Sequence, residues 1–324
     1  MRVGMDVSPL VQTRAGTARY VKGLLRELPD VRRLAFGGPG RASTLARDAA
    51  WYPLGLARRA RTERLDVLHC PTYRGPVRPP VPLVVTVHDL AVFRHPETFN
   101  RWTRTYSPLL VPRVLGAAAR VIAVSEFTRR ELVELLRVAI EKIRVLPNGV
   151  EDAFDPDGPA AEGDYVLAVG TLEPRKNLPR LAEAARRADV ELRVVGARGW
   201  GGVRVEGNGV RWLGEVSDEE LARLYRGALC LAYPSLYEGF GIPVLEAMAC
   251  GTPVVTSAGG ATEEVAAGAA VLVDPLDPAA IAAGIEQAAG RREELRREGL
   301  ERARRFTWRD AARATADVYR EAAE

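Results

Sequence analysis

A loop with two glycines and one carboxylate precedes a short helix in the last third of the chain, and a second carboxylate lies inside that helix. The residues are Glu238, the run Gly239-Phe240-Gly241-Ile242, and Glu246. Glycine lets the backbone approach a ligand closely, and amides at the amino end of a helix favour an anion. Carboxylates beside such a cradle accept hydrogen bonds from hydroxyl groups. The pattern therefore suits a ligand that carries both a diphosphate and hydroxyls, as a nucleotide-sugar does.

The sequence itself indicates where the helix after this loop begins and ends. Pro243 suits the first turn of a helix, where a missing N–H is no loss, and Leu245 and Met248 fall on one apolar face. Gly251 ends the helix, and an apolar strand begins at Val254. The stretch is therefore predicted to be loop, helix, turn and strand.

An ordinary helix entry is the alternative interpretation of the loop alone, because acidic residues favour the positive end of a helix and Gly-x-Gly is a weak signal. The whole string EGFGIPVLEAMACGTPVV, residues 238–255, carries more information. It resembles the signature of the family 4 retaining glycosyltransferases of the GT-B fold, mannosyltransferase-like subgroup, in which Glu238 and Glu246 form the E-x7-E pair. The resemblance extends over nearly the whole chain.

Short apolar strands alternate with amphipathic helices along the 324 residues, which indicates an α/β protein with parallel sheets and about two domains. The resemblance implies two Rossmann-like doubly wound domains that face a central crevice. We expect an acceptor-side domain over residues 1–152, onto which a helix over 308–324 crosses back. A nucleotide-sugar-binding domain is expected over 153–307.

The second domain is predicted to begin with a strand over 165–169, followed by a basic loop. Gly170 opens this loop, which resembles the family's phosphate-clamping loop. Lys176 would give the diphosphate a point charge and Arg175 a forked one. Many members of the family place an arginine directly after the glycine, where this chain has Thr171. We expect Arg175 to take over that role, and an unremarkable surface turn is the alternative.

The resemblance assigns further residues to the site. It places His88 beside the reacting sugar, although a lone histidine is more often structural and Asp89 could simply orient a turn. Gly16, with neighbouring Arg14, would lie over the donor phosphates and the acceptor, or would make an ordinary tight turn. The remaining positions implied to bind the donor are the backbone near Gly214 and Val216 for the base, Gly239, Phe240, Gly241, Ile242 and Leu245 around the diphosphate, Glu246 for the ribose and Glu238 for the sugar.

Charge is divided unevenly along the chain. Residues 1–153 carry 25 Lys and Arg against 14 Asp and Glu, whereas residues 154–324 carry 21 against 28. The basic half could meet an anionic acceptor or a membrane surface, which would make the protein peripheral at the inner membrane face. The alternative is that arginine-rich helices have solvated faces. No nucleic-acid module is recognisable, so nucleic acid is not an expected partner.

The composition limits the cellular setting. The three cysteines, Cys70, Cys230 and Cys250, show no paired or metal-ligand spacing, which fits a reduced compartment. We see neither a signal peptide nor an apolar run of the ~20 residues that a membrane span needs, and we expect a cytoplasmic protein. The sequence Asp155-Pro156-Asp157 matches the D-x-D pattern of some metal sites, but these residue types are more typical of a turn. The resemblance implies transfer without a metal or other cofactor.

The expected activity is transfer of a hexose from GDP-mannose or a UDP-sugar to a hydroxyl acceptor. The resemblance alone implies retention of the anomeric configuration, and it suggests polysaccharide or glycolipid biosynthesis. The acceptor would be a sugar, a lipid-linked molecule or a small molecule. A glycoside phosphorylase, a sugar-nucleotide epimerase of the same fold and a non-catalytic anion-binding or membrane-binding protein remain alternatives.

Overall fold

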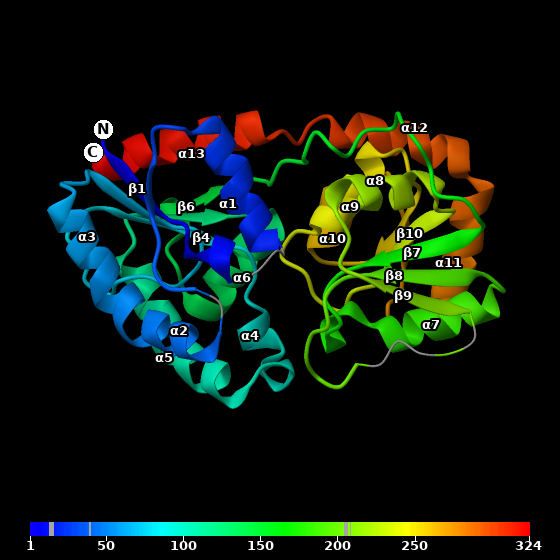
Figure 1. The fold of residues 1–324 in the computed structure, drawn as a ribbon, viewed down its shortest axis with the longest axis horizontal. Coiled ribbons are helices and arrows are strands. Elements are labelled where there is room, and N and C mark those ends of the chain that lie inside the picture. Colours follow the sequence, from blue (N-terminus) through cyan, green and yellow to red (C-terminus); the bar gives the residue numbers. More distant parts are fainter. Residues whose placement is uncertain (13–15, 39, 204–206, 208) are drawn as a thin grey trace. The chain divides into compact units, whose positions relative to one another are not determined.

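The structure is a computed structural model that describes residues 1–12, 16–38, 40–203, 207 and 209–324. The chain forms two compact units, each with its own sheet (Figure 1). Unit 1 comprises Met1–Gly149 and Trp308–Glu324, and unit 2 comprises Val150–Thr307. The first boundary therefore falls slightly before the position expected from the sequence.

Unit 1 is built on a parallel sheet of six strands with the order β2-β1-β3-β4-β5-β6. The strands are short apolar runs that are buried on both faces, as parallel strands usually are. The two edge strands depart from this pattern, because β2 has two exposed arginines and two of the three residues of β6 are half-buried. The strands are β1 (Val3–Asp6), β2 (Arg32–Leu34), β3 (Val67–Cys70), β4 (Leu83–Val87), β5 (Arg120–Ala123) and β6 (Ile143–Val145).

Helices cover both faces of the sheet in unit 1. Alternate residues of the strands belong to different apolar clusters, so that Leu68 and Val85 face one side while Val67 and Val84 face the other. The helices are α1 (Gly16–Glu27), α2 (Arg41–Ala46), α3 (Leu56–Thr62), α4 (Ala91–Arg94), α5 (Arg101–Ala117), α6 (Glu126–Leu136) and α13 (Trp308–Ala323). Shorter or π-helical pieces are η1 (Ser8–Val11), η2 (Arg47–Gly55), η3 (Pro96–Thr98) and η4 (Ile140–Lys142).

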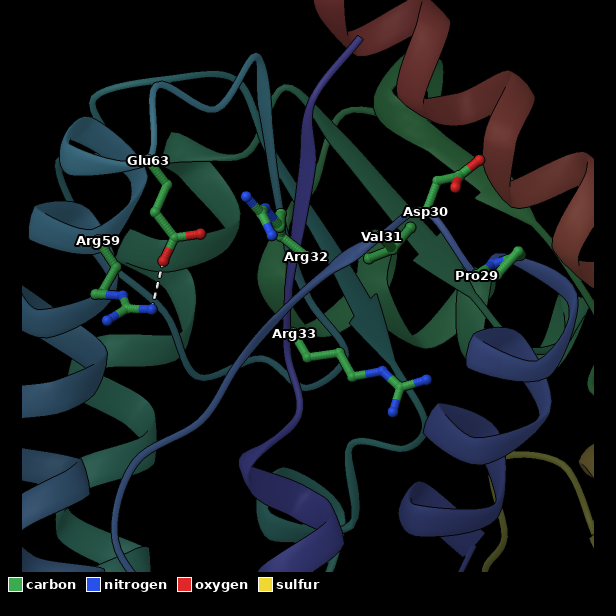
Figure 2. A pocket seen from close by; sticks show the side chains of 7 residues that line it. All are labelled: Pro29, Asp30, Val31, Arg32, Arg33, Arg59 and Glu63. Atoms are coloured by element: carbon green, nitrogen blue, oxygen red, sulfur yellow. Dashed lines mark ion pairs between the residues drawn. The ribbon is translucent and has the colours of Figure 1, made fainter.

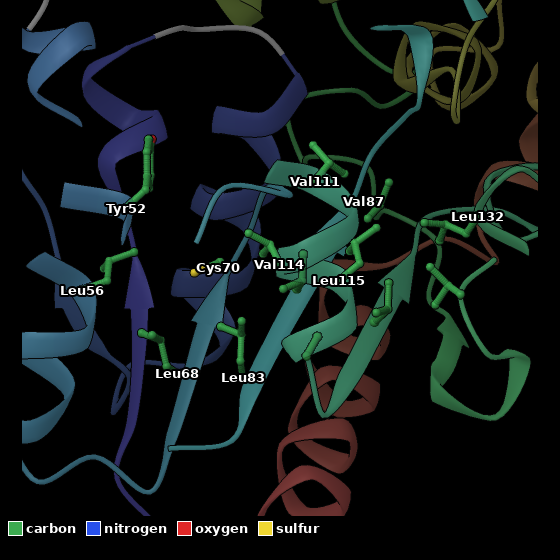
Figure 3. Packing of buried hydrophobic residues seen from close by; sticks show 14 of the residues in the cluster. Tyr52, Leu56, Leu68, Cys70, Leu83, Val87, Val111, Val114, Leu115 and Leu132 are labelled. Atoms are coloured by element: carbon green, nitrogen blue, oxygen red, sulfur yellow. The ribbon is translucent and has the colours of Figure 1, made fainter. Parts of the chain in front are cut away.

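Figure 3 shows the larger of these clusters, in which side chains of β3 and β4 meet those of α5 and the α2–α3 region. Leu68 and Leu83 project from the strands, Val114 and Leu115 from α5, and Leu56 from α3. On the opposite face, α1 and α13 pack against each other. The last helix therefore completes the core of the unit that contains the first strand.

Unit 2 also holds a parallel sheet of six strands, with the order β12-β11-β10-β7-β8-β9. Counted from its own first strand, this is the 3-2-1-4-5-6 order of dinucleotide-binding sheets, and the order reverses between β7 and β10. The strands are β7 (Tyr165–Val169), β8 (Glu191–Val195), β9 (Val210–Gly214), β10 (Cys230–Tyr233), β11 (Val254–Ser257) and β12 (Val271–Val273).

Helices lie on both faces of this second sheet as well. One apolar cluster joins alternate strand residues such as Val166 and Ala232 to α7 and α11. The intervening residues, Leu167 and Leu231, are equally buried, and α8 and α9 contact β7 and β10. The helices are η5 (Pro174–Lys176), α7 (Leu178–Arg187), α8 (Asp218–Gly227), α9 (Ile242–Ala249), α10 (Ala261–Ala266), α11 (Pro278–Gly290) and α12 (Arg292–Ala303).

The prediction of two Rossmann-like, doubly wound sheets is confirmed. Helix α6 begins at Glu126, where the Ser125 hydroxyl accepts a hydrogen bond from the Thr128 amide at 3.0 Å and caps the first turn.

Candidate active site

The carboxyl ends of β7 and β10 bring the two motif loops of unit 2 together. The loop after β7 contains Arg175 and Lys176, and the loop after β10 contains Glu238 and Gly241. The Leu236 amide donates to the Arg175 carbonyl at 2.8 Å. Ligands of open α/β sheets bind outside the strand ends at the point where the strand order reverses. The topology therefore puts both loops where a ligand is expected.

A lysine, a tyrosine and a glutamate form a compact triad at this place. Lys176 Nζ lies 2.6 Å from Glu238 Oε1 and 2.6 Å from the Tyr233 hydroxyl. The Tyr233 hydroxyl in turn donates to Glu238 Oε1 at 3.0 Å. The Lys176 and Glu238 side chains are only 13% and 12% exposed, so the ion pair is largely withdrawn from water.

The two charges of the pair stabilise each other. Burial lowers the pKa of Lys176, but the carboxylate of Glu238 and the neighbouring Tyr233 outweigh it, so the lysine pKa lies above its usual value. Burial likewise raises the pKa of Glu238, yet Lys176 and Arg175 bring that pKa below its ordinary value. Both side chains are therefore charged at neutral pH.

Arg175 directs its guanidinium group toward its own loop and the next one. One terminal nitrogen lies 2.7 Å from Glu173 Oε1, and the other donates to the Tyr237 carbonyl at 3.2 Å. Thr171, the position where an arginine was expected from the resemblance, is half-buried. Arg175 thus connects the loops that follow β7 and β10.

The glycines of both loops hold backbone shapes that other residues adopt only with strain. Gly241, which precedes α9, has φ +105°, and a Cβ there would lie 2.9 Å from Thr262 Cγ2. A Cβ on Gly170, at φ +149°, would lie 3.0 Å from the Lys176 side chain. Phe240 packs its ring edge to face against Phe306. The Phe240 side chain therefore anchors the loop that contains Gly239 and Gly241.

Helix α9 starts at Ile242 and carries Pro243 in its first turn, so its first amides lie next to the glycine loop. Leu245 is buried in the core below. Glu246 is only 2% exposed, and its Oε2 accepts a hydrogen bond from the Tyr225 hydroxyl at 3.0 Å. One carboxylate oxygen of Glu246 is thus hydrogen-bonded to a tyrosine of α8.

The positions predicted to meet the base lie at the end of β9. Gly214 has φ +74° and its carbonyl accepts from the Gly196 amide at 2.8 Å. Val216 is half-buried, just before the Ser217 cap of α8. Both belong to the carboxyl edge of the same sheet, because β9 pairs with β8 and β8 with β7.

In unit 1, His88 follows β4 at the carboxyl edge of that sheet. Its Nε2 lies 3.0 Å from the Pro71 carbonyl, and its ring meets the Tyr20 ring edge to face, with centroids 4.8 Å apart. Burial lowers the His88 pKa, although the Pro71 carbonyl and Asp89 act in the opposite direction. Asp89 Oδ1 accepts from the Ala91 amide at 3.0 Å and so shapes the entry of α4.

Gly16 is the first residue of α1 in the same unit, and the neighbouring Arg14 lies outside the described residues. In the Asp155-Pro156-Asp157 sequence, the Asp155 side chain accepts a hydrogen bond from the Asp157 amide at 2.8 Å, which forms a local turn. Over the described part of the chain we find no group of three or more His, Cys, Asp and Glu side chains that could hold a metal ion. No described helix is both long and apolar enough to cross a membrane.

Sequence reasoning missed two tyrosines, Tyr233 and Tyr225. Tyr233 contacts both members of the ion pair, and Tyr225 contacts Glu246. A signal existed for Tyr233, because it ends the strand that feeds the motif and therefore lies at the ligand-binding edge of the sheet. No sequence signal connects Tyr225 on α8 with a carboxylate on α9.

A surface hollow lies elsewhere in unit 1, beside the edge strand β2 (Figure 2). Figure 2 shows the paired Arg59 and Glu63 on one side of it and Arg32 and Arg33 near its centre. It contains none of the predicted site residues. Charged side chains are a usual protection of edge strands against pairing with other chains, which accounts for its arginines.

Two family models match the chain. "Glycosyltransferase Family 4" matches residues 2–154, and "Glycosyl transferases group 1" matches residues 150–306. The O-antigen chain mannosyltransferase B of Escherichia coli is 34% identical over 267 residues, which cover 73% of this chain and 70% of that protein. These two models together account for nearly the whole sequence.

Solved structures share the fold at low identity. The sucrose-phosphate synthase of Thermosynechococcus elongatus superimposes with a TM-score of 0.79 at 21% identity, over 99% of this chain and 98% of that one. The Anabaena protein HepE, solved with UDP and glucose, gives a TM-score of 0.76 at 18% identity, over 98% of both chains. The two sheets of this chain are thus those of the GT-B fold.

Proposed function

The chain belongs to the family 4, group 1 glycosyltransferases, and on this premise we propose that it moves a hexose from a nucleoside-diphosphate sugar to a hydroxyl acceptor with retention of the anomeric configuration. The E. coli relative is a mannosyltransferase by name, and HepE was solved with UDP and glucose. GDP-mannose and UDP-sugars are therefore the donors to test first. The acceptor is a sugar, a lipid-linked molecule or a small molecule.

One observation carries the donor assignment. A buried ion pair of Lys176 and Glu238, 2.6 Å apart, lies where the strand order of unit 2 reverses, next to a glycine loop and the amino end of α9. A lysine and helix-end amides suit a diphosphate, and a carboxylate suits sugar hydroxyls. Core ion pairs without a ligand role are often replaceable by apolar residues, so a pair at this edge of the sheet favours a binding role.

In the proposed reaction, the bond between the anomeric carbon and the β-phosphate oxygen breaks as the acceptor oxygen bonds to that carbon on the same face. The acceptor proton passes to the leaving phosphate. Negative charge grows on the diphosphate, where Lys176, Arg175 and the amides of Gly239–Ile242 stabilise it. Glu238 binds hydroxyls of the sugar, Glu246 binds the ribose, and His88 also touches the sugar.

We propose that the transfer needs no bound metal, because Lys176 and Arg175 with the helix amides supply the positive charge that a cation would give to a departing diphosphate. Retention of activity in excess chelator would support this point. Loss of activity that added magnesium restores would overturn it and leave the transfer assignment intact.

A panel of GDP, UDP, ADP and TDP in a thermal-shift assay identifies the base, since a ligand at a hundred times its dissociation constant stabilises by ~2.7 kcal/mol. Product analysis then separates the rival activities. A phosphorylase would need added phosphate and no nucleotide, and an epimerase would convert the donor without an acceptor. The proton spectrum of the new glycoside reports whether the configuration is retained.

Lys176→Ala tests the diphosphate site directly. We expect turnover to fall a hundredfold or more, on the order of 3 kcal/mol, because a donor to the growing charge is lost. Lys22→Ala removes an exposed lysine of α1 and is the matched control. Unchanged kinetics in the Lys176 variant would contradict the assignment.

A membrane partner is a second proposal, and the exposed side of α5 favours it. Trp102 and Leu109 are 51% and 56% exposed, although both are large and apolar. The helix carries Arg101, Arg104 and Arg113 and no acidic residue. Exposed aromatic and aliphatic side chains among arginines match the surface of an anionic bilayer, where a lipid-linked acceptor would reside.

The double variant Trp102→Ser with Leu109→Ser tests this proposal by co-sedimentation with vesicles of phosphatidylglycerol and phosphatidylcholine. We expect the wild type to bind, with weaker binding at higher salt, and the variant to bind about tenfold less. Leu276→Ser, at an apolar residue of unit 2 that is 61% exposed, is the control. Equal binding of all three proteins, or no binding of the wild type, would overturn the membrane proposal.

A further inference from the structure

Four buried polar side chains form a continuous chain of hydrogen bonds inside unit 1. The Tyr319 hydroxyl lies 2.7 Å from His69 Nδ1, and His69 Nε2 lies 2.8 Å from Thr86 Oγ1. Thr86 Oγ1 lies 2.9 Å from the Tyr20 hydroxyl. All four residues are buried, and the proposed transfer uses none of them directly.

The members of this chain come from elements that are far apart in the sequence. Tyr20 belongs to α1, His69 to β3, Thr86 to β4 and Tyr319 to α13, the last helix. Buried polar groups are costly unless they are hydrogen-bonded, and here each partner supplies what its neighbour needs. Such a satisfied network has one preferred arrangement and therefore fixes the rotamers of its members.

Tyr20 connects the network to the candidate active site. Its ring packs edge to face on the His88 ring, at a centroid distance of 4.8 Å and an interplanar angle of 81°. His88 has a second constraint, because Nε2 lies 3.0 Å from the Pro71 carbonyl. A carbonyl only accepts, so Nε2 carries a proton, and the neutral ring has its lone pair on Nδ1. The two contacts together set the direction in which Nδ1 points.

We propose that Tyr20 is a positioning residue for His88, and that the hydrogen-bond chain through Thr86 and His69 to Tyr319 holds the Tyr20 ring in place. The inference rests on the proposed function in one respect, namely that His88 touches the donor sugar. It assigns the last helix a part in the geometry of the active site. Tyr20 acts on the reaction only through His88.

The contacts around His88 limit what else could control it. Asp89, its neighbour in the chain, acts on the pKa of His88, and His88 in turn acts on the pKa of the buried His69. Burial, together with the smaller effect of His88, lowers the pKa of His69 to about 3, so His69 stays neutral in the ordinary pH range. The Tyr20 ring carries no charge and therefore affects His88 through packing and exclusion of water.

The chain has only three histidines, His69, His88 and His95, so their ¹⁵N-labelled imidazoles can be followed individually. We compare wild type with Tyr20→Phe, Tyr20→Leu and Tyr319→Phe in the full-length protein. The nitrogen shifts report the tautomer and pKa of His88, and initial rates with the donor found by the nucleotide panel report kcat and KM.

We expect Tyr20→Leu to raise the pKa of His88 toward its ordinary value and to lower kcat at least about tenfold, with the donor KM little changed. Tyr20→Phe keeps the ring and loses the hydroxyl, so it should restore most of kcat while still shifting the His69 signals. Tyr319→Phe should shift both histidines in the same direction by a smaller amount. If Tyr20→Leu does not fold, the two phenylalanine variants still decide the question.

Tyr52→Phe is the control for stability, because it removes a partly buried hydrogen bond that Gln12 donates to the Tyr52 hydroxyl in the same unit, without touching His88. Unchanged His88 signals in every Tyr20 and Tyr319 variant would overturn the proposal, as would an equal shift in Tyr52→Phe. A separate variant, His88→Ala, tests the proposed function. If it transfers sugar normally, the role of His88 fails, and the NMR result still decides whether Tyr20 positions its ring.

Discussion

The ion pair of Lys176 and Glu238 holds two proposed ligands of the donor against each other. At 2.6 Å and with both side chains mostly buried, the ammonium has a carboxylate where the proposed diphosphate would bind. Mutual attraction is strong in such surroundings because little water screens it. If the proposed roles hold, donor binding exchanges one anion for another at Lys176 and releases Glu238 for the sugar hydroxyls.

This exchange predicts opposite effects of one substitution on two measurements. In Glu238→Gln the competing charge is gone, so UDP or GDP without a sugar should bind on the order of tenfold more tightly, since a hydrogen bond to a charged group is worth about 1.5–3 kcal/mol. Sugar transfer should fall, because the carboxylate that we propose to bind sugar hydroxyls is lost. Isothermal titration calorimetry and initial rates measure the two quantities.

Glu293→Gln, at an exposed position in the first turn of α12, is the matched control and should change neither quantity. Weaker binding of the sugar-free nucleotide to Glu238→Gln would show that Glu238 mainly orders Lys176 rather than competing with the diphosphate. In that case the Tyr233 hydroxyl, which contacts both side chains, would be insufficient to hold the lysine.

The sequence was sufficient to select Lys176, Glu238 and Glu246, and it could not reveal their partners. Lys176 and Glu238 are 62 residues apart, and they meet because β7 and β10 are neighbours in the sheet. That neighbourhood follows from the strand order, which no local pattern contains. The bond from Tyr225 to Glu246 depends in the same way on how α8 packs against α9. The roles of Lys176, Glu238 and Glu246 stay predictions, as do those of His88, Gly16, Gly214 and Val216.

At the scale of elements, the entry of α9 depends on one glycine. Gly241 adopts φ +105° directly before the helix, which turns the chain from the loop into the first turn. An L-residue is strained in this region, and here its Cβ would also approach Thr262 of α10 at 2.9 Å. The loop that presents the amides is therefore held by backbone geometry as well as by Phe240.

Gly241→Ala should lower the free energy of unfolding by about 1–2 kcal/mol, from the left-handed strain, and should weaken nucleotide binding because the amides turn away. Chemical denaturation and calorimetry measure the two effects. Gly290→Ala, at the end of α11 with open space around its Cβ position, should be neutral or stabilising by up to about 1 kcal/mol. Equal behaviour of the two variants would contradict the argument.

The strand over Tyr165–Val169 was predicted with its observed bounds, because it is an apolar run between turn residues. Two elements of unit 1, β2 and η2, have no sequence pattern from which they could be predicted. β2 has only three residues, and two of them are exposed arginines. The π-helical η2 contains Pro53, which local rules would place at the end of a helix rather than inside it. Both elements owe their form to the strand and helices they pack against.

At the scale of the molecule, the two units differ in the number of chain segments that form them. Unit 2 is one continuous segment, whereas unit 1 needs the last seventeen residues of the chain, Trp308–Glu324. Trp308 covers Gly23 of α1 so closely that a Cβ at position 23 would lie 2.1 Å from Trp308 Cδ2. Tyr319 adds its bond to His69 further along the same helix. The core of unit 1 is therefore incomplete until Trp308–Glu324 has been made.

Trp308→Ala should accordingly weaken one unit and spare the other. Removing a buried tryptophan costs about 3–5 kcal/mol, and the loss falls on the apolar cluster formed by Met5, Tyr20 and Leu24. Hydrogen exchange should accelerate in the strands of unit 1 while the strands of unit 2 keep their protection. Trp200→Ala, at a half-exposed tryptophan of unit 2, should leave both units protected. Faster exchange in both units of the Trp308 variant would mean that the two cores unfold as one, and that α13 stabilises the molecule as a whole.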